Sequence, residues 1–197
     1  DQAVPYINKL VLDGRNAEAI QMATRLRNQN PGAPAAHLLL GDALMANGQA
    51  ADAARSYRAA AGIRFSEPVA MRMIDALSEA GQAGEALRTL DLFLSQNPRS
   101  VPGLLMAADH FMETGQWQPA IELLEGLRFR LGNRDGAVLS YLGWARFNTG
   151  ETDQGISMLG AAYGMAPSNP AFADAYGWAL YQSGRNREGG VALLSKA

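Results

Sequence analysis

One glycine recurs along the whole chain at a nearly constant interval. Successive members of the series lie 34, 33, 34, 35 and 34 residues apart. These six marker glycines are Gly14, Gly48, Gly81, Gly115, Gly150 and Gly184. Five residues after each of them stands a small residue, and this second series is Ala19, Ala53, Ala86, Ala120, Gly155 and Gly189. A fixed period of this length indicates repeated supersecondary units that bury their apolar faces against one another.

Apolar residues on both sides of the marker glycines follow helical spacing. Residues 37–44 show it before Gly48, and residues 53–60 show it after that glycine. The i, i+3, i+4, i+7 pattern predicts amphipathic helices, and no segment alternates with period two, so we expect no strands. Each unit is therefore predicted to be an A helix, a tight turn and a B helix. Glycine suits the turn because it tolerates the positive φ found at helix C-termini.

Residues in several repeats resemble the signature of the tetratricopeptide-repeat family, whose period is about 34 residues. In the second repeat the matching residues are Leu40, Gly41, Leu44, Gly48, Ala53, Tyr57 and Ala60. The fifth repeat carries Leu142, Gly143, Gly150, Ala162 and Pro167, and the sixth carries Tyr176, Gly177, Leu180 and Gly184. The resemblance covers essentially the whole chain. It implies an all-α fold, a right-handed α-α superhelix (a solenoid) of about six helix–turn–helix repeats.

The repeats are expected to form one array along the chain. Their predicted bounds are residues 1–33, 34–66, 67–100, 101–135, 136–169 and 170–197. The sixth repeat stops at Ala197 before its expected breaker, and the chain starts at Asp1 without a methionine. We therefore expect the chain to be a fragment of a longer protein.

Three features predict how individual B helices end or pack. Prolines follow the first, third and fifth B helices and should end them, because the residue before a proline resists helical geometry: these are Pro31, Pro98 and Pro167. Residues 132–136 follow the fourth B helix, belong to the one long interval and contain no proline, so that helix should be longer or the superhelical pitch should change there. Gly155 and Gly189 replace the usual alanine, so the last two B helices should be looser or more closely packed.

Composition and motifs exclude several classes of function. The net charge of −2 argues against a general nucleic-acid binder, and the absence of cysteine excludes disulfides and thiolate metal sites. No apolar run reaches the roughly 18 residues that a membrane span needs. The histidines, His37 and His110, belong to no metal-binding pattern and are interpreted as structural or exposed residues. No phosphate-binding loop or nucleophile motif is present, so we expect no enzyme, no metal and no cofactor.

The resemblance implies that A helices line the inner face of the solenoid, which makes the residues of that face predictable. Six residues before the marker glycines stand Asn8, Asp42, Asp75, Asp109, Trp144 and Trp178. Three residues before them stand Val11, Met45, Ser78, Met112, Phe147 and Tyr181, and ten residues before them stand Val4, Leu38, Met71, Leu105, Ser140 and Asp174. The predicted protein- or peptide-binding residues are Asp42, Met45, Asp75, Asp109, Met112, Tyr141, Trp144, Phe147, Asp174, Trp178 and Tyr181. This inner face should be acidic in the middle repeats and aromatic in the last two.

A less specific interpretation stands beside this one. The aspartates could bond to a neighbouring helix or to water, and Met45, Met112 and Phe147 could serve inter-repeat packing. A segment of the same protein beyond the chain could also fill the groove at Trp144 and Trp178.

The leading hypothesis is a scaffold that binds a basic or amphipathic protein segment in this groove. Aromatic anchors would supply most of the affinity there, and exposed aspartates would mainly orient the partner. The alternative is a non-catalytic regulatory or assembly arm of a larger enzyme or polysaccharide-export system. A third interpretation is self-association through the end faces. Arginine greatly outnumbers lysine, and residues 174–181 resemble late repeats of bacterial tetratricopeptide proteins, which favours a bacterial cytoplasm or periplasm without choosing between them.

Overall fold

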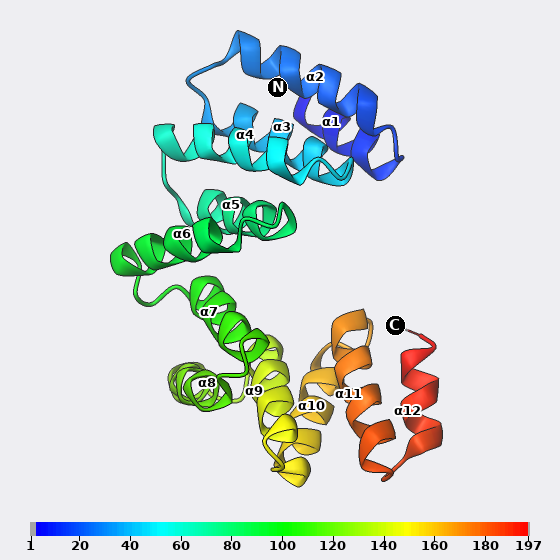
Figure 1. Cartoon of the computed structure of the whole chain (residues 1–197). Helices are drawn as coiled ribbons and strands as arrows, with labels where there is room; N and C mark the ends of the chain where they lie inside the picture. The colour runs from blue at the N-terminus through cyan, green and yellow to red at the C-terminus, as the bar shows by residue number, and fades with distance from the viewer. Residues whose placement is uncertain (1–2, 197) are drawn as a thin grey trace. The chain divides into compact units, whose positions relative to one another are not determined.

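The computed structural model of the chain describes residues 3–196, and in this range it contains twelve α-helices and no strand (Figure 1). The A helices are α1 (Ala3–Leu12), α3 (Pro34–Ala46), α5 (Glu67–Glu79), α7 (Val101–Glu113), α9 (Gly136–Asn148) and α11 (Pro170–Ser183). The B helices are α2 (Asn16–Gln29), α4 (Ala50–Ile63), α6 (Ala83–Gln96), α8 (Trp117–Leu131), α10 (Thr152–Met165) and α12 (Arg187–Leu194). The predicted all-α, helix–turn–helix architecture is therefore confirmed.

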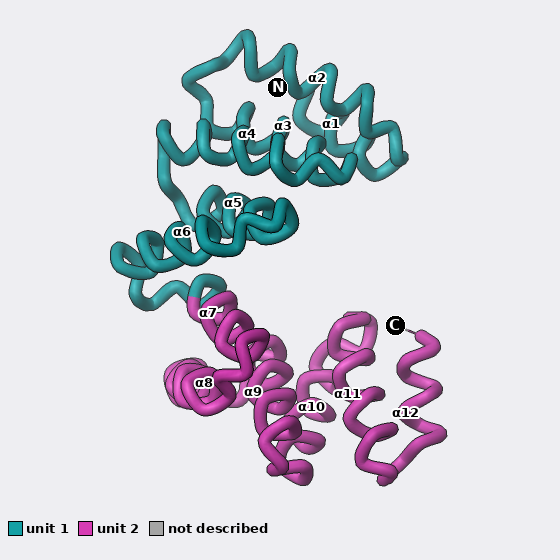
Figure 2. Tube along the Cα trace, viewed as in Figure 1, with its two compact units in different colours: residues 1–103 teal, residues 104–197 magenta. Residues whose placement is uncertain are grey.

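The chain divides into two compact units, residues 1–103 and residues 104–197, and the boundary falls inside α7 (Figure 2). Within unit 1, consecutive helices from α1 to α6 pack against each other, and the A helices α1 and α3 are also in contact. Within unit 2, consecutive helices from α8 to α12 pack together, and the A helices α9 and α11 touch. The prediction of one continuous array over residues 1–197 stays a prediction.

The turn between an A helix and its B helix shows the same pair of hydrogen bonds in the first five repeats. At the second repeat, the Gly48 amide donates to the Met45 carbonyl and the Gln49 amide donates to the Leu44 carbonyl, both at 2.9 Å. Gly48 has a φ of 72°, in the left-handed region that glycine adopts without a steric penalty. All six marker glycines have φ values between 70° and 91°. The predicted role of these glycines as helix terminators is confirmed.

The ends of three B helices follow the prolines. Pro31, Pro98 and Pro167 each lie two residues beyond the last residue of a B helix. The residue before each proline has left helical geometry, with φ between −131° and −145°. Helix α8, which no proline ends, has 15 residues, whereas α2, α4, α6 and α10 have 14 each. The expectation of a longer fourth B helix is confirmed, and Gly132, with a φ of 70°, ends it.

The core of unit 1 depends on matched small and large residues. Ala19, Ala53 and Ala86, five residues after their marker glycines, are buried where the B helix meets the rest of the unit. The Tyr57 ring lies against Gly41, where an added Cβ would come within 2.2 Å of the ring. Gly41 therefore leaves the space that the buried tyrosine occupies.

In unit 2, glycines on both helices bring the two helices of a hairpin into close contact. A Cβ on Gly155 of α10 would lie 2.8 Å from the Gly143 carbonyl oxygen of α9. A Cβ on Gly190 of α12 would lie 2.6 Å from the Gly177 carbonyl oxygen of α11. Of the two expectations for these B helices, close packing is therefore the correct one.

The fixed offset of five residues predicts that Gly189 makes the close contact in the last repeat. In the structure, Gly190 makes it instead. The reason is one extra residue in the last turn. Helix α12 begins three residues after Gly184, whereas α10 begins two residues after Gly150. Gly189 instead donates its amide to the side chain of the N-cap residue Asn186, at 2.9 Å.

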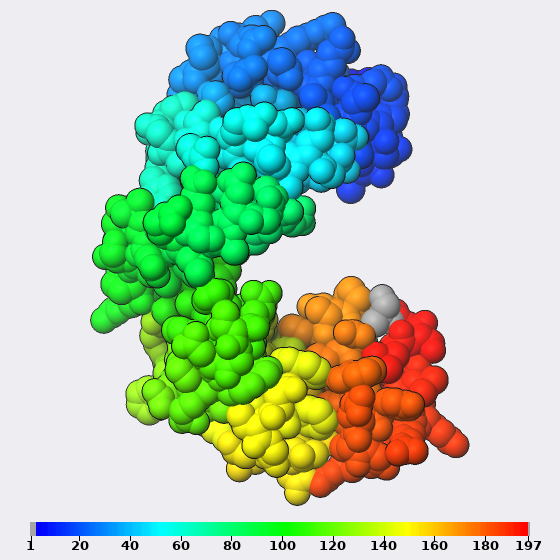
Figure 3. All heavy atoms as spheres, in the orientation of Figure 1, coloured from blue at the N-terminus to red at the C-terminus, as the bar shows by residue number. Residues whose placement is uncertain are grey.

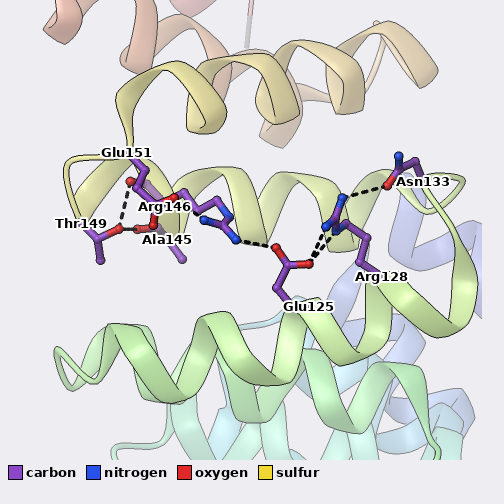
Figure 4. Close-up of polar contacts among 7 residues, drawn as sticks. All are labelled: Glu125, Arg128, Asn133, Ala145, Arg146, Thr149 and Glu151. Atoms are coloured by element: carbon purple, nitrogen blue, oxygen red, sulfur yellow. Dashed lines mark hydrogen bonds and ion pairs between the residues drawn. The ribbon is translucent and has the colours of Figure 1, made fainter.

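A network of charged side chains joins α8 to the next hairpin (Figure 4). Glu125 of α8 accepts from Arg128 at 2.7 Å and from Arg146 of α9 at 2.6 Å. Arg146 also pairs with Glu151 in the turn after α9. Its side chain is only 16% exposed, so the pairs are partly shielded from solvent. In the space-filling view, the hairpin of α9 and α10 packs directly on its neighbours in unit 2 (Figure 3).

Candidate functional site

A groove of about 500 Å³ lies within unit 2. The nine residues that line it are Asp109, Met112, Ser140, Tyr141, Trp144, Ala171, Asp174, Ala175 and Trp178. Every one of them belongs to an A helix, α7, α9 or α11. The groove is thus built from the face of the repeats that the sequence pattern assigns to the inner side, and its volume lies in the usual range for ligand pockets.

The groove crosses its three helices obliquely. Helix α7 contributes residues six and three places before its marker glycine, whereas α9 contributes residues ten, nine and six places before. Helix α11 contributes residues from thirteen to six places before its marker glycine. Each successive helix therefore presents an earlier part of its length. A bound segment would lie across the helices, in contact with three repeats at once.

Three of the nine residues that line the groove are aromatic, namely Tyr141, Trp144 and Trp178. Trp144 stacks on Phe147 of the same helix, with ring centroids 6.2 Å apart and an angle of 19° between the planes. In the next repeat, Trp178 contacts Tyr181 at the same centroid distance. The spacing i, i+3 places both rings of each pair on one helix face. Trp178 remains 42% exposed, so a large apolar ring is accessible at the groove.

Two carboxylates are among the nine residues that line the groove, and none of the nine is basic. Asp109 comes from α7 and Asp174 comes from α11. Burial and, to a smaller extent, the neighbouring Glu113 raise the pKa of Asp109, and His110 partly opposes them. The surroundings of Asp109 therefore disfavour its negative charge, although the residue as a whole is exposed.

The structure brings most of the sequence-predicted residues of unit 2 together. Asp109, Met112, Tyr141, Trp144, Asp174 and Trp178 line the groove. Phe147 and Tyr181 lie beside it, in ring contact with the two tryptophans. Met112 is 8% exposed, so most of its surface serves packing.

The other three predicted residues, Asp42, Met45 and Asp75, lie in unit 1. The Asp42 carboxylate accepts a hydrogen bond from the Tyr57 hydroxyl at 2.7 Å and one from Arg72 Nε at 2.9 Å. It therefore joins α3 to α4 and α5, in agreement with the interpretation that the aspartates bond to neighbouring helices. Burial, followed by Glu79, raises the pKa of Asp75, and Arg72 partly opposes this.

Sequence reasoning missed two small residues of the groove, Ala171 and Ala175. A signal for Ala175 exists, because it stands nine residues before its marker glycine. The corresponding residues of the earlier repeats are larger, namely Pro5, Leu39, Arg72, Met106 and Tyr141. A small side chain at this place in the last repeat opens the groove on the α11 side.

Outside the groove, His37 has a structural environment. Its Nε2 donates to the Pro31 carbonyl at 2.9 Å, and its own carbonyl accepts from the Ser56 hydroxyl at 3.0 Å. The side chain is buried and ties the loop after α2 to α3 and α4. Among residues 3–196, no group of three or more histidines and carboxylates has the arrangement of a metal site. None of the helices in this range is both long and apolar enough to cross a membrane.

Comparisons with known proteins agree with this fold. Residues 11–67 match the family model described as tetratricopeptide repeat. The comparison with curated protein sequences found no match.

Solved structures resemble the chain over most of its length. One is the Cut9–Hcn1 heterotetramer of the APC/C, with a TM-score of 0.79 and 16% identity over 96% of this chain. This chain spans 38% of the length of that protein. A tetratricopeptide-repeat protein from Parabacteroides merdae matches with a TM-score of 0.73 and 14% identity, over 99% of this chain and 77% of its own. A thermophilic protein of the same kind from Thermus thermophilus matches with a TM-score of 0.70 and 19% identity, over 84% and 90%.

At such low identity these structures show the fold alone. Residues 11–67 thus match the tetratricopeptide-repeat model in sequence, and the chain shares the helical-repeat fold of these solved structures over most of its length.

Proposed function

We propose that the chain binds a basic or amphipathic protein segment in the groove of unit 2. The tetratricopeptide fold is one of protein-interaction scaffolds, and this chain shares it. The observation that carries the proposal is the composition of the groove: tryptophans from two consecutive repeats and two aspartates open into one volume of about 500 Å³. Large aromatic side chains dominate the energetics of protein interfaces, so Trp144 and Trp178 are the proposed anchors.

The shape of the groove supports a segment rather than a small molecule. Its lining comes from three repeats and crosses them obliquely, so contacts are spread along a track. Secondary structure holds every lining residue, which keeps the surface preformed and lowers the entropic cost of binding. Flexible loops contribute none of the nine residues.

The proposal is tested by selecting peptides from a random display library on the wild-type chain and measuring their affinities by calorimetry. The substitutions Trp144→Ala and Trp178→Ala are made separately. Each is expected to weaken the binding of the selected peptides at least about tenfold, because each removes an aromatic anchor. Circular dichroism of both variants checks that they remain folded.

Phe129→Ala is the matched control. Phe129 is an exposed aromatic residue on α8, outside the groove, with 94% of its surface accessible. The affinities of the selected peptides are expected to stay within about twofold of the wild type in this variant. Equal affinities for the wild type and both tryptophan variants would reject the groove as the binding surface.

A further inference from the structure

Unit 1 contains a contact that the groove of unit 2 lacks. Asp42, six residues before its marker glycine, pairs with Arg72 of the following repeat at 2.9 Å. Arg72 stands nine residues before the next marker glycine. The inner-face aspartate of the second repeat is thus paired with an arginine that the third repeat supplies.

Unit 2 places an aspartate at the same position without an arginine to follow it. Asp109 stands six residues before Gly115, as Asp42 does before Gly48. The residue nine places before the next marker glycine is Tyr141, and it lines the same groove as Asp109. The chain therefore keeps the carboxylate of this pair and puts an aromatic ring where the cation would be.

We propose that an arginine side chain of the bound segment takes, at Asp109, the place that Arg72 takes at Asp42. This inference rests on the proposed function and specifies the chemistry of its ligand. The guanidinium group faces Asp109, and its plane and aliphatic stem lie along the aromatic wall of Tyr141, Trp144 and Trp178. Residues beside the arginine in the bound segment are apolar, because the rest of the lining is mainly apolar.

Arginine fits this groove better than lysine does. A guanidinium group is planar, stacks on aromatic faces and donates two parallel hydrogen bonds to a carboxylate, whereas an ammonium group is a strongly hydrated point charge. The wall offers three aromatic residues, and the raised pKa of Asp109 is a cost that a paired cation removes. Asp174 of α11, which lines the same groove, adds to the negative field and repels anions.

The test uses the indole N–H signals in the NMR spectrum of the whole chain. The chain has three tryptophans, Trp117, Trp144 and Trp178, so the spectrum holds three such signals. The probes are the capped tripeptides acetyl-Leu-Arg-Leu-amide, acetyl-Leu-Lys-Leu-amide and acetyl-Leu-citrulline-Leu-amide, each added up to roughly 10 mM. Citrulline has nearly the shape of arginine and carries no charge.

The arginine probe is expected to shift the signals of Trp144 and Trp178 while that of Trp117, on α8 outside the groove, stays in place. The lysine probe should bind more weakly, and the citrulline probe should produce less than about one fifth of the arginine effect at equal concentration. The substitution Asp109→Asn should weaken the binding of the arginine probe at least about fivefold. The control Asp91→Asn, an exposed residue of α6 in unit 1, should leave its affinity unchanged.

Equal binding of the arginine and citrulline probes would overturn the inference, as would an Asp109→Asn variant that binds the arginine probe like the wild type. An arginine probe that shifts no indole signal would overturn it as well. These failures are separable from failure of the proposed function. Suppose that the display-selected peptides require Trp144 and Trp178 but still bind when their arginine is replaced by citrulline. The proposed binding groove would then stand, and only the proposed arginine contact would be rejected.

Discussion

Gly155 and Gly126 are both glycines inside B helices, but their surroundings differ. Around Gly155 of α10, an added Cβ would lie 2.8 Å from the Gly143 carbonyl oxygen and 2.8 Å from the Phe147 amide nitrogen. Both of these atoms are backbone atoms, so no side-chain rotation can make room. Around Gly126 of α8, an added Cβ would meet no atom within 4 Å.

Gly155→Ala is therefore expected to destabilise the chain by about 1–3 kcal/mol, because separating α9 from α10 outweighs the gain in helix propensity. Gly126→Ala should stabilise it by about 0.5–1 kcal/mol, because alanine loses less backbone entropy in a helix. Urea unfolding followed by circular dichroism measures both changes. Equal effects of the two substitutions would contradict the role assigned to Gly155.

Asp109 gives a second prediction at the residue scale, on the pH dependence of stability. Because burial and Glu113 raise its pKa in the folded state, the folded chain binds this proton more tightly than the unfolded chain. The contribution of this proton to stability is present below the unfolded pKa and is lost as the pH rises through the folded pKa. Asp109→Asn has no such proton to lose.

The stability of Asp109→Asn relative to the wild type is therefore expected to increase between about pH 3 and pH 6, as measured by urea unfolding at several pH values. Asp91→Asn, which removes a carboxyl group from α6 in unit 1, serves as the control for the loss of one negative charge. A stability difference between Asp109→Asn and the wild type that is constant with pH would show that the Asp109 carboxyl has similar surroundings in both states.

At the scale of the helices, the sequence predicts the turns well because their cause is local. A positive φ after a helix favours glycine whatever surrounds it, and the marker glycines locate every A–B turn. The packing glycine of the last hairpin is a different case. Gly190 makes the close contact because the last turn has one more residue, and a fixed offset in the sequence cannot register that.

The residues of the groove could be predicted from the sequence only in part. Helical periodicity assigns residues to the inner face, and this assignment includes Trp144 and Trp178. Which part of that face opens into a groove depends on how each repeat is rotated relative to the previous one. The oblique course of the groove therefore includes Ala171 and leaves out Phe147, which a constant position in each repeat does not anticipate. The hydrogen bond between Tyr57 and Asp42 likewise depends on how α3 and α4 pack against each other.

Arg146 connects helices and gives a prediction at their scale. Burial alone would raise the pKa of Glu125, but hydrogen bonds from Arg146 and Arg128 outweigh burial and lower it. Arg146→Met should destabilise the chain by about 1–3 kcal/mol near neutral pH, because charged hydrogen-bond acceptors lose their donor. Since a lowered folded pKa stabilises only while the carboxyl is ionised, this difference should shrink as the pH falls below about 4.

The matched control is Arg185→Met. Arg185 pairs with Asp153, but the two side chains are 52% and 75% exposed. Exposed pairs contribute little, so we expect a change of less than about 1 kcal/mol in the free energy of unfolding. Equal losses from Arg146→Met and Arg185→Met would mean that the Glu125 network does not connect α8 to the next hairpin with the expected strength.

At the scale of the whole molecule, the two units should be distinguishable in unfolding. All three tryptophans lie in unit 2, so their fluorescence reports on that unit, whereas circular dichroism reports on every helix. Repeats in such folds interact mainly with their nearest neighbours.

Tyr57→Ala removes a buried ring from unit 1. It should lower the urea midpoint of part of the circular-dichroism signal, while the midpoint measured by tryptophan fluorescence stays unchanged. A tryptophan midpoint that moves equally far would show that the units unfold as one.

The most direct measurement for the binding groove is a map of amide shifts in the NMR spectrum of the isotopically labelled chain, recorded with and without a display-selected peptide. We predict that the shifted amides concentrate on α7, α9 and α11, with the largest changes around Trp144 and Trp178. Shifts confined to the B helices α8, α10 and α12, or to unit 1, would contradict the assignment of the groove as the surface where this chain holds its partner.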